Sequence, residues 1–301
     1  MVAKVFHPSR QIVPISDAIR ERYKIESNKK KSRYVHILLS SAGGQGKTAF
    51  IGTASRCVTI DGVDTLPYNN LLLIQYDPLG EDTLYDMKAG FDLVTPRSEK
   101  ELLDVISFIN SSQADQYDVV ALDAYHKMQE IESDAVLKVG ITKTQLSHRT
   151  TKHDEEILEL QDYNRLHKRC NAINDKLISI KKHLIITCIK SLKDDPRDLS
   201  KKKEDRKQII SLSLDGKMAH LLSTQFSLHG IMSRTGGGDN IHVETDFTTY
   251  NSEAKTRFRM DGVQQDLTFP KLLELLSIRD RAFQLIEWKH DHKGFLPILR
   301  E

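Results

Sequence analysis

Cysteine, tryptophan, net charge and long apolar runs are all scarce in this sequence of 301 residues. Its three cysteines, Cys57, Cys170 and Cys188, are far apart and odd in number, so the sequence predicts neither a disulfide framework nor a zinc knuckle. Reduced thiols of this kind are typical of a cytoplasmic protein. A formal net charge of only +2 provides no overall field for nucleic acid, so any such role must depend on local basic patches.

Long apolar segments are missing as well. The longest runs, such as 71–74, are far shorter than the roughly 20 residues that cross a bilayer. The N-terminal segment, MVAKVFHPSRQIVPIS, has neither the apolar core nor the small-residue cleavage site of a signal peptide. We therefore expect a cytoplasmic protein without a membrane partner.

The residues that are present predict a globular α/β domain. Hydrophobic residues make up 39% and charged residues 29% of the chain, which is enough to bury a core. Continuous apolar segments typical of buried strands lie at 34–40, 71–77, 118–123 and 183–189. Segments with helical spacing lie at 98–112, 154–180 and 269–288. This alternation predicts a mainly parallel sheet with helices on both faces, and shorter strands over 226–262 predict an antiparallel C-terminal extension.

Changes of composition predict how the chain is organised. We expect an N-terminal basic arm or tail at 1–33, an α/β domain at 34–289 and a C-terminal tail at 290–301. Within the domain, residues 190–208 are charge-dense and almost free of apolar side chains, which predicts a mobile loop.

A glycine-rich segment follows the first expected strand and precedes a segment with helical spacing. It matches the phosphate-binding pattern G-x-x-x-x-G-K-[ST], except that serine replaces the first glycine. Its residues are Ser41, Ala42, Gly43, Gly44, Gln45, Gly46, Lys47 and Thr48. Such glycines let successive backbone N–H groups point at phosphate oxygens. We expect Lys47 to reach the β- and γ-phosphates of ATP and the Thr48 hydroxyl to coordinate Mg²⁺.

Polar side chains end the neighbouring strands at the same edge of the predicted sheet. Asp123 ends one strand and is expected to hold the magnesium ion through a water molecule. Asp77 is the first candidate for orienting the attacking water and Glu81 the second, with a helix cap or a solvated acid as the alternative for each. Thr187, near the end of another strand, is either a sensor of the γ-phosphate or a packed core residue.

The order of these segments resembles that of phage RecA-like ATPases, over about residues 34–278. The resemblance rests on GGQGKT, LLLIQYDPLGEDTL, DVVALDAYHKM, LQDYNRLHKRCNAINDKL, HLIITCIKSL, IISLSLDGKMAHLL, FSLHGIMSR, AKTRFRMDG and TFPKLLELL. It implies a RecA-like P-loop NTPase fold, the use of ATP and Mg²⁺, and an ATPase of phage DNA recombination or single-strand annealing. The implied partners are single-stranded DNA, a single-strand-binding protein and further copies of the chain in a ring or filament. The implied location is the cytoplasm of a phage host, or of a cell carrying the gene on a mobile element.

Two other interpretations remain open. AGGQGKT followed by LLLIQYDPLG also resembles ParA-type partition ATPases, although Ala42 replaces the signature lysine of that loop and Gln75 replaces an aspartate. The other alternative is a nucleotide-dependent switch or assembly protein that does not bind DNA.

Two basic segments are candidates for interactions beyond the nucleotide. The segment 190–207 contains eight basic and five acidic residues, so it is either a DNA-binding loop or a solvated one. Its candidate DNA-binding residues are Lys190, Lys193, Lys201, Lys202, Lys203, Arg206 and Lys207. On a strand, Lys255, Arg257 and Arg259 would lie on one face. They would then contact either a phosphate bound by a neighbouring subunit or acids such as Glu244 and Asp246.

Overall fold

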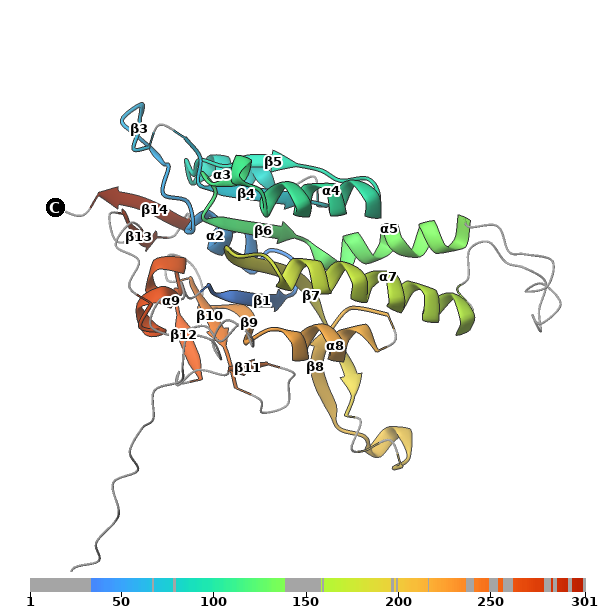
Figure 1. The fold of residues 1–301 in the computed structure, drawn as a ribbon. Coiled ribbons are helices and arrows are strands. Elements are labelled where there is room, and N and C mark those ends of the chain that lie inside the picture. Colours follow the sequence, from blue (N-terminus) through green and yellow to red (C-terminus); the bar gives the residue numbers. More distant parts are fainter. Residues whose placement is uncertain are drawn as a thin grey trace, which may run out of the picture. The chain divides into compact units, whose positions relative to one another are not determined.

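The fold centres on one large, mainly parallel sheet (Figure 1). The structure, a computed structural model, describes residues 34–299 apart from 67, 78–79, 139–157, 159, 196–197, 199, 216, 237–240, 249–253, 257–261, 279–282, 284–285 and 292–293. The predicted arm at 1–33 therefore lies outside the described residues. Among those described, no helix combines the length and the apolar character that crossing a bilayer requires.

Six parallel strands form the centre of the sheet, in the order β5-β4-β6-β7-β1-β9. They are β1 (His36–Ser41), β4 (Leu71–Gln75), β5 (Asp92–Val94), β6 (Val119–Asp123), β7 (His183–Asp194) and β9 (Leu228–Thr235). Strand β7, although late in the sequence, thus lies between β1 and β6. The four predicted buried strands correspond to β1, β4, β6 and β7, and the parallel sheet is confirmed.

Antiparallel strands extend this sheet after β9, as the sequence predicts. They are β10 (His242–Asp246), β11 (Lys255–Thr256) and β12 (Val263–Gln265), while β8 (Gln208–Leu212) pairs with the far half of β7. Two separate hairpins are formed by β2 (Thr59–Ile60) with β3 (Val63–Asp64), and by β13 (Ile286–Asp291) with β14 (Gly294–Leu299).

Helices cover both faces of the sheet because the side chains of each strand alternate between two apolar clusters. Leu38, Leu72 and Val120 pack under the helices of one face, and their neighbours Ile37 and Leu71 under those of the other. The first face carries α4 (Glu99–Ile109), α5 (Tyr125–Lys138), α7 (Leu160–Ile178) and α8 (Met218–Gln225). The second carries α2 (Lys47–Gly52), α3 (Glu81–Asp86) and α9 (Phe269–Leu275). Short 3₁₀ turns occur at Ser112–Ala114 and Lys203–Asp205.

Two expectations about the end of the chain need correction. The helix predicted over 269–288 ends at Leu275, and β13 begins at Ile286. The predicted tail from residue 290 continues instead into β14, where Phe295 packs with Trp288 against Val58 in a buried cluster. Apolar anchors of this kind give a terminal hairpin a surface to pack on. The other boundaries of the predicted domains stay predictions.

The charged segment after β7 is also more ordered than expected. Strand β7 continues to Asp194 and pairs with β8 from Lys190↔Leu212 to Asp194↔Gln208. Between the two strands, the described residues include a 3₁₀ turn at Lys203–Asp205, and Figure 1 shows the hairpin projecting from the sheet. The backbone hydrogen bonds of this pairing explain why a sequence so rich in charge still forms strands.

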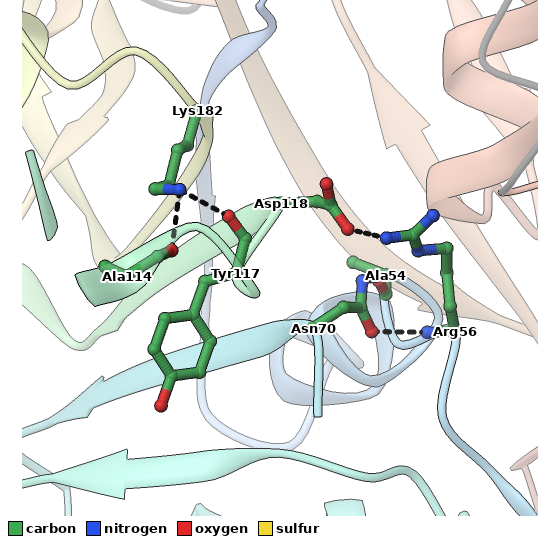
Figure 2. A network of polar contacts seen from close by, with 7 residues as sticks. All are labelled: Ala54, Arg56, Asn70, Ala114, Tyr117, Asp118 and Lys182. Atoms are coloured by element: carbon green, nitrogen blue, oxygen red, sulfur yellow. Dashed lines mark hydrogen bonds and ion pairs between the residues drawn. The ribbon is translucent and has the colours of Figure 1, made fainter. Parts of the chain in front are cut away.

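A polar network ties together the amino ends of the strands (Figure 2). Buried Asn70, just before β4, accepts the backbone N–H of Arg56 at 2.7 Å and donates to the Ala54 carbonyl oxygen at 3.3 Å. The Arg56 guanidinium pairs with Asp118, just before β6. Lys182, just before β7, donates to the carbonyl oxygens of Ala114 at 2.8 Å and Tyr117 at 2.6 Å, and burial lowers the pKa of its ammonium group.

Removing the Asn70 side chain is expected to destabilise the fold without changing the opposite edge of the sheet. Asn70→Ala leaves the Arg56 N–H and the Ala54 carbonyl without their partner, so the free energy of unfolding should fall by about 2–4 kcal/mol. Urea denaturation measures this change. The control is Asn110→Ala at the exposed end of α4, which should change the free energy of unfolding by less than about 0.5 kcal/mol. Equal effects of the two variants would contradict the role of the network.

Candidate functional site

The carboxyl ends of the parallel strands surround a cavity of about 680 Å³. In a parallel α/β sheet, ligands bind at this edge. The cavity is lined by residues 43–49 of the glycine-rich loop and by Asp77, Gly80, Thr83, Asp86, Met87, Asp123, Ala124, His126, Ile189, Arg234, Phe295 and Leu296. The predicted loop and two of the predicted carboxylates therefore meet in one cavity.

The loop from Ser41 to Thr48 curls back on itself between β1 and α2. Gly44 and Gly46 have φ angles of +68° and +94°, values that favour glycine. A Cβ at Gly46 would also lie 3.2 Å from Val243 Cγ2, so two independent constraints select glycine there. The Gln45 side chain holds the loop to the end of β9, because its Oε1 accepts the backbone N–H of Arg234 at 2.6 Å.

Lys47 is held against the start of the loop. Its Nζ donates to Ser41 Oγ at 2.7 Å and to the Ala42 carbonyl oxygen at 3.0 Å. Burial lowers the pKa of the Lys47 ammonium, and the negative charge of Asp123 acts in the opposite direction. Ser41, the residue that departs from the phosphate-binding pattern, is fully buried at the end of β1 and supplies one of these two acceptors.

Asp123, at the tip of β6, accepts hydrogen bonds from two threonine hydroxyls. Thr48 Oγ1 donates to Asp123 Oδ2 at 2.8 Å, and Thr187 Oγ1 donates to Oδ1. Thr187 is fully buried in β7 and does not line the cavity. The structure thus brings Thr187 to the carboxylate of Asp123, and the predicted sensor role stays a prediction.

Of the two candidates for orienting water, Asp77 lines the cavity and Glu81 does not. The backbone of Asp77 is fixed beside β6, because its N–H donates to the Asp123 carbonyl oxygen at 3.3 Å and the N–H of Tyr76 donates to the same oxygen at 2.6 Å. A further carboxylate that the sequence analysis missed, Asp86 at the end of α3, also lines the cavity.

Other lining residues were missed as well. Arg234 is exposed near the end of β9 and places a cation at the cavity. Only the pairing of β9 with β1 brings it there, and no sequence motif marks it. Burial lowers the pKa of His126, at the start of α5. Phe295 and Leu296 of β14 supply apolar surface, and no sequence motif marks them.

The predicted DNA-binding residues lie along the β7–β8 hairpin, which begins directly after the cavity residue Ile189. Part of this set is already paired within the hairpin. Lys201 Nζ lies 2.9 Å from Asp198 Oδ1, and its hydrogen bond lowers the pKa of Asp198. Arg206 Nη1 lies 3.1 Å from Asp194 Oδ2, and Lys193 Nζ donates to the Leu214 carbonyl oxygen at 3.0 Å. Lys190 is half-buried. Lys202, Lys203 and Lys207 are exposed, as is the paired Lys201.

The predicted contact with a neighbouring subunit falls largely outside the described residues, since these exclude Arg257 and Arg259. Lys255 lies in β11, where its backbone pairs with His229 of β9.

The strand order, the curled loop between β1 and α2, and the carboxylate at the tip of β6 together decide the fold. The chain has a RecA-like P-loop fold. The predicted fold class is therefore confirmed, whereas the resemblance to the phage family stays a prediction.

Comparisons with known proteins add little to this assignment. No protein-family model matches the chain, and no curated protein matches it. Among solved structures, the chain is similar to a KaiC-like protein from the hyperthermophilic archaea Pyrococcus horikoshii OT3, at 9% identity over 88% of this chain and 89% of that chain, with a TM-score of 0.42. It is also similar to the RadB recombinase, at 11% identity over 88% of this chain and 90% of that chain, with a TM-score of 0.38. At these values the function has to be argued from the site.

Proposed function

We propose that this protein binds ATP together with Mg²⁺ and hydrolyses it, as a RecA-like ATPase. The observation that carries the proposal is the meeting of the glycine-rich loop, Thr48 and Asp123 in one cavity. Glycines with left-handed φ angles, a lysine and a hydroxyl on a loop after a strand suit a triphosphate. The cavity of about 680 Å³ falls within the range of small-molecule sites.

The residues present fit a magnesium ion. Thr48 and Asp123 place two hard oxygen donors 2.8 Å apart at the cavity, and Mg²⁺ prefers oxygen ligands. Thr48 would bind the ion through its hydroxyl and Asp123 through a water molecule. When bound, the ion would neutralise charge on the β- and γ-phosphates.

The other polar side chains of the cavity have separate roles in binding the phosphates and orienting water. Lys47 moves from Ser41 to the phosphates and neutralises part of their charge. Asp77, at the tip of the strand next to β6, accepts a hydrogen bond from the attacking water and orients it toward the γ-phosphate. Arg234 provides a second cation from the same chain. Phosphate release from ATP, measured with Mg²⁺ and again after chelation, tests the proposal; turnover that is absent or indifferent to Mg²⁺ would contradict it.

Single-stranded DNA is the partner that we propose for this ATPase. The support is the position of the β7–β8 hairpin, which continues the strand of the cavity residue Ile189 and exposes Lys202, Lys203 and Lys207. A strand that runs from the nucleotide to a basic hairpin links the two sites through continuous backbone. Stimulation of ATP turnover by an oligonucleotide is the expected result, and a protein that binds no DNA at any salt concentration would favour the switch or assembly alternative.

Neutralising the exposed lysines of the hairpin is expected to weaken DNA binding and its dependence on salt. In the triple alanine variant of Lys202, Lys203 and Lys207, the log–log salt slope should become shallower by about 0.7 for each phosphate that the protein no longer neutralises. ATP affinity should stay unchanged, because none of the three residues lines the cavity. The measurement is a salt titration of oligonucleotide binding followed by fluorescence anisotropy.

The matched control removes the same charge from helices. Lys100, Lys168 and Lys176 are exposed on α4 and α7, and their triple alanine variant should keep the slope of the unmodified protein. A hairpin variant whose slope equals that of this control would show that the lysines are only a solvated surface.

The resemblance to phage RecA-like ATPases extends the proposal to DNA recombination or strand annealing beside a single-strand-binding protein. The same resemblance extends the proposal to assembly of the chain into a ring or filament. In this assembly, Lys255, Arg257 and Arg259 would contact the nucleotide of a neighbouring subunit. Mixing Arg257→Ala with Asp123→Asn subunits tests the assembly, since ATP turnover should return only where an intact site meets an intact arginine.

A further inference from the structure

Two histidines and an aspartate from distant parts of the sequence converge beside the nucleotide cavity. His242 begins β10, Asp266 directly follows β12, and His290 lies in β13. One ligand atom from each residue lies within 4.8 Å of the others. His242 Nδ1 is 2.7 Å from Asp266 Oδ2, and His290 Nδ1 is 4.0 Å from Asp266 Oδ1. Within the described part of the chain, no other group of three such side chains comes together in this way.

The three side chains are held in place by their surroundings. Asp266 Oδ1 accepts the backbone N–H of Val243 at 2.9 Å, and the N–H of Asp266 donates to the Val243 carbonyl oxygen at 2.7 Å. The His290 side chain is 8% exposed and packs edge-on against Phe295, with ring centroids 5.0 Å apart. The rings of His242 and His290 are stacked at 6.2 Å. Hydrogen bonds and packing that orient ligands in this way are what metal sites require.

From this geometry we propose that His242, Asp266 and His290 bind a zinc ion, with a water molecule as the fourth ligand. In a tetrahedral zinc site with bonds of about 2.0–2.1 Å, the ligand atoms lie about 3.3 Å apart. The two histidines approach different oxygens of Asp266, and the three ligand atoms lie within 4.8 Å of one another. Rotations of these side chains would bring the ligand atoms to the tetrahedral spacing. Imidazole ligands select zinc over Mg²⁺, which prefers oxygen. The site is therefore distinct in chemistry from the pair formed by Thr48 and Asp123.

The ion would join two parts of the fold. His242 and Asp266 belong to the antiparallel edge of the main sheet, whereas His290 belongs to the separate β13–β14 hairpin. The same hairpin contributes Phe295 and Leu296 to the cavity. Zinc thus fixes the apolar wall that β14 provides beside the phosphate-binding loop.

Zinc titration of the full-length protein tests the proposal. After removal of metal by a chelator, calorimetry against a competing chelator should detect one zinc ion per chain. His290→Gln and Asp266→Asn should each lower the zinc affinity by about 100-fold or more, because removing a ligand costs at least as much as removing the groups that orient it. His220→Gln on α8, which replaces an exposed histidine, should bind zinc like the unmodified protein.

Two further measurements keep the test independent of misfolding. Zinc should slow hydrogen exchange over 286–299 in the unmodified protein but not in His242→Gln, while far-ultraviolet circular dichroism stays the same. Cobalt should give the absorption of a four-coordinate nitrogen and oxygen site. A thiolate-to-cobalt band would assign the metal to cysteine instead. That band, a failure to bind zinc, or equal zinc affinities in all variants would overturn the proposal.

Discussion

Replacing Lys47 by alanine is expected to lower ATP affinity by about 100-fold or more while leaving the fold intact. The ammonium group is the charged donor of the loop, and hydrogen bonds from charged groups contribute about 1.5–3 kcal/mol each, which corresponds to roughly tenfold per 1.4 kcal/mol. The polar partners of this ammonium, Ser41 and the Ala42 carbonyl, belong to the loop itself, so the truncation leaves the apolar core in place. Calorimetric titration with ATP and Mg²⁺ measures the affinity.

The control for this variant is Lys176→Ala, which removes an exposed lysine on α7. Its ATP affinity and its circular dichroism should equal those of the unmodified protein. An unchanged affinity in Lys47→Ala, with an intact spectrum, would remove the phosphate-binding role from the loop.

Asp77→Asn is expected to slow ATP turnover by about 100-fold or more and to leave ATP affinity unchanged. A group that orients and polarises the attacking water typically contributes about 10²–10⁴-fold to the rate, and an amide cannot accept the proton of that water. Asp77 fits this role because it lines the cavity from the tip of the strand beside Asp123. Single-turnover phosphate release and a separate binding titration distinguish the two quantities.

Neighbouring carboxylates give matched controls for this change. Asp86→Asn alters another acid of the cavity, and Glu81→Gln alters an acid outside it; both should keep turnover within a few-fold. A slow Asp86→Asn or Glu81→Gln with a normal Asp77→Asn would move the role to that residue. Asp123→Asn should instead weaken the Mg²⁺-dependent part of ATP binding, since Asp123 accepts the hydroxyl of Thr48.

The elements that the sequence predicts well are those in which local pattern and tertiary environment agree. Buried parallel strands are apolar on both faces, so β1, β4, β6 and β7 were predictable from composition alone. The start of α4 was predictable for a local reason, because Ser98 accepts the N–H of Glu101 at 3.3 Å as a helix cap. The glycine-rich loop combined both kinds of signal, and it anchored the prediction of the cavity.

The elements that were missed depend on interactions between distant segments. The residues 286–291 satisfy a helical spacing as well as a strand, and their pairing with Gly294–Leu299 decides the outcome. The burial of Phe295 in one cluster with Val58 and Met87 cannot be inferred from any of these segments alone. Arg234 and Asp86 were missed for the same reason, since only the strand order and the position of α3 bring them to the cavity.

Ser41 has a consequence for how tightly a nucleotide can be held. Because its hydroxyl and the Ala42 carbonyl already accept hydrogen bonds from Lys47, a phosphate that binds this lysine replaces existing bonds rather than adding new ones. The affinity for a nucleotide would then be a difference between two sets of interactions, and part of the attraction of Lys47 for the phosphate would be cancelled. A glycine at this position would supply no competing hydroxyl. We therefore expect the site to hold a nucleotide less tightly than a loop with glycine in place of Ser41.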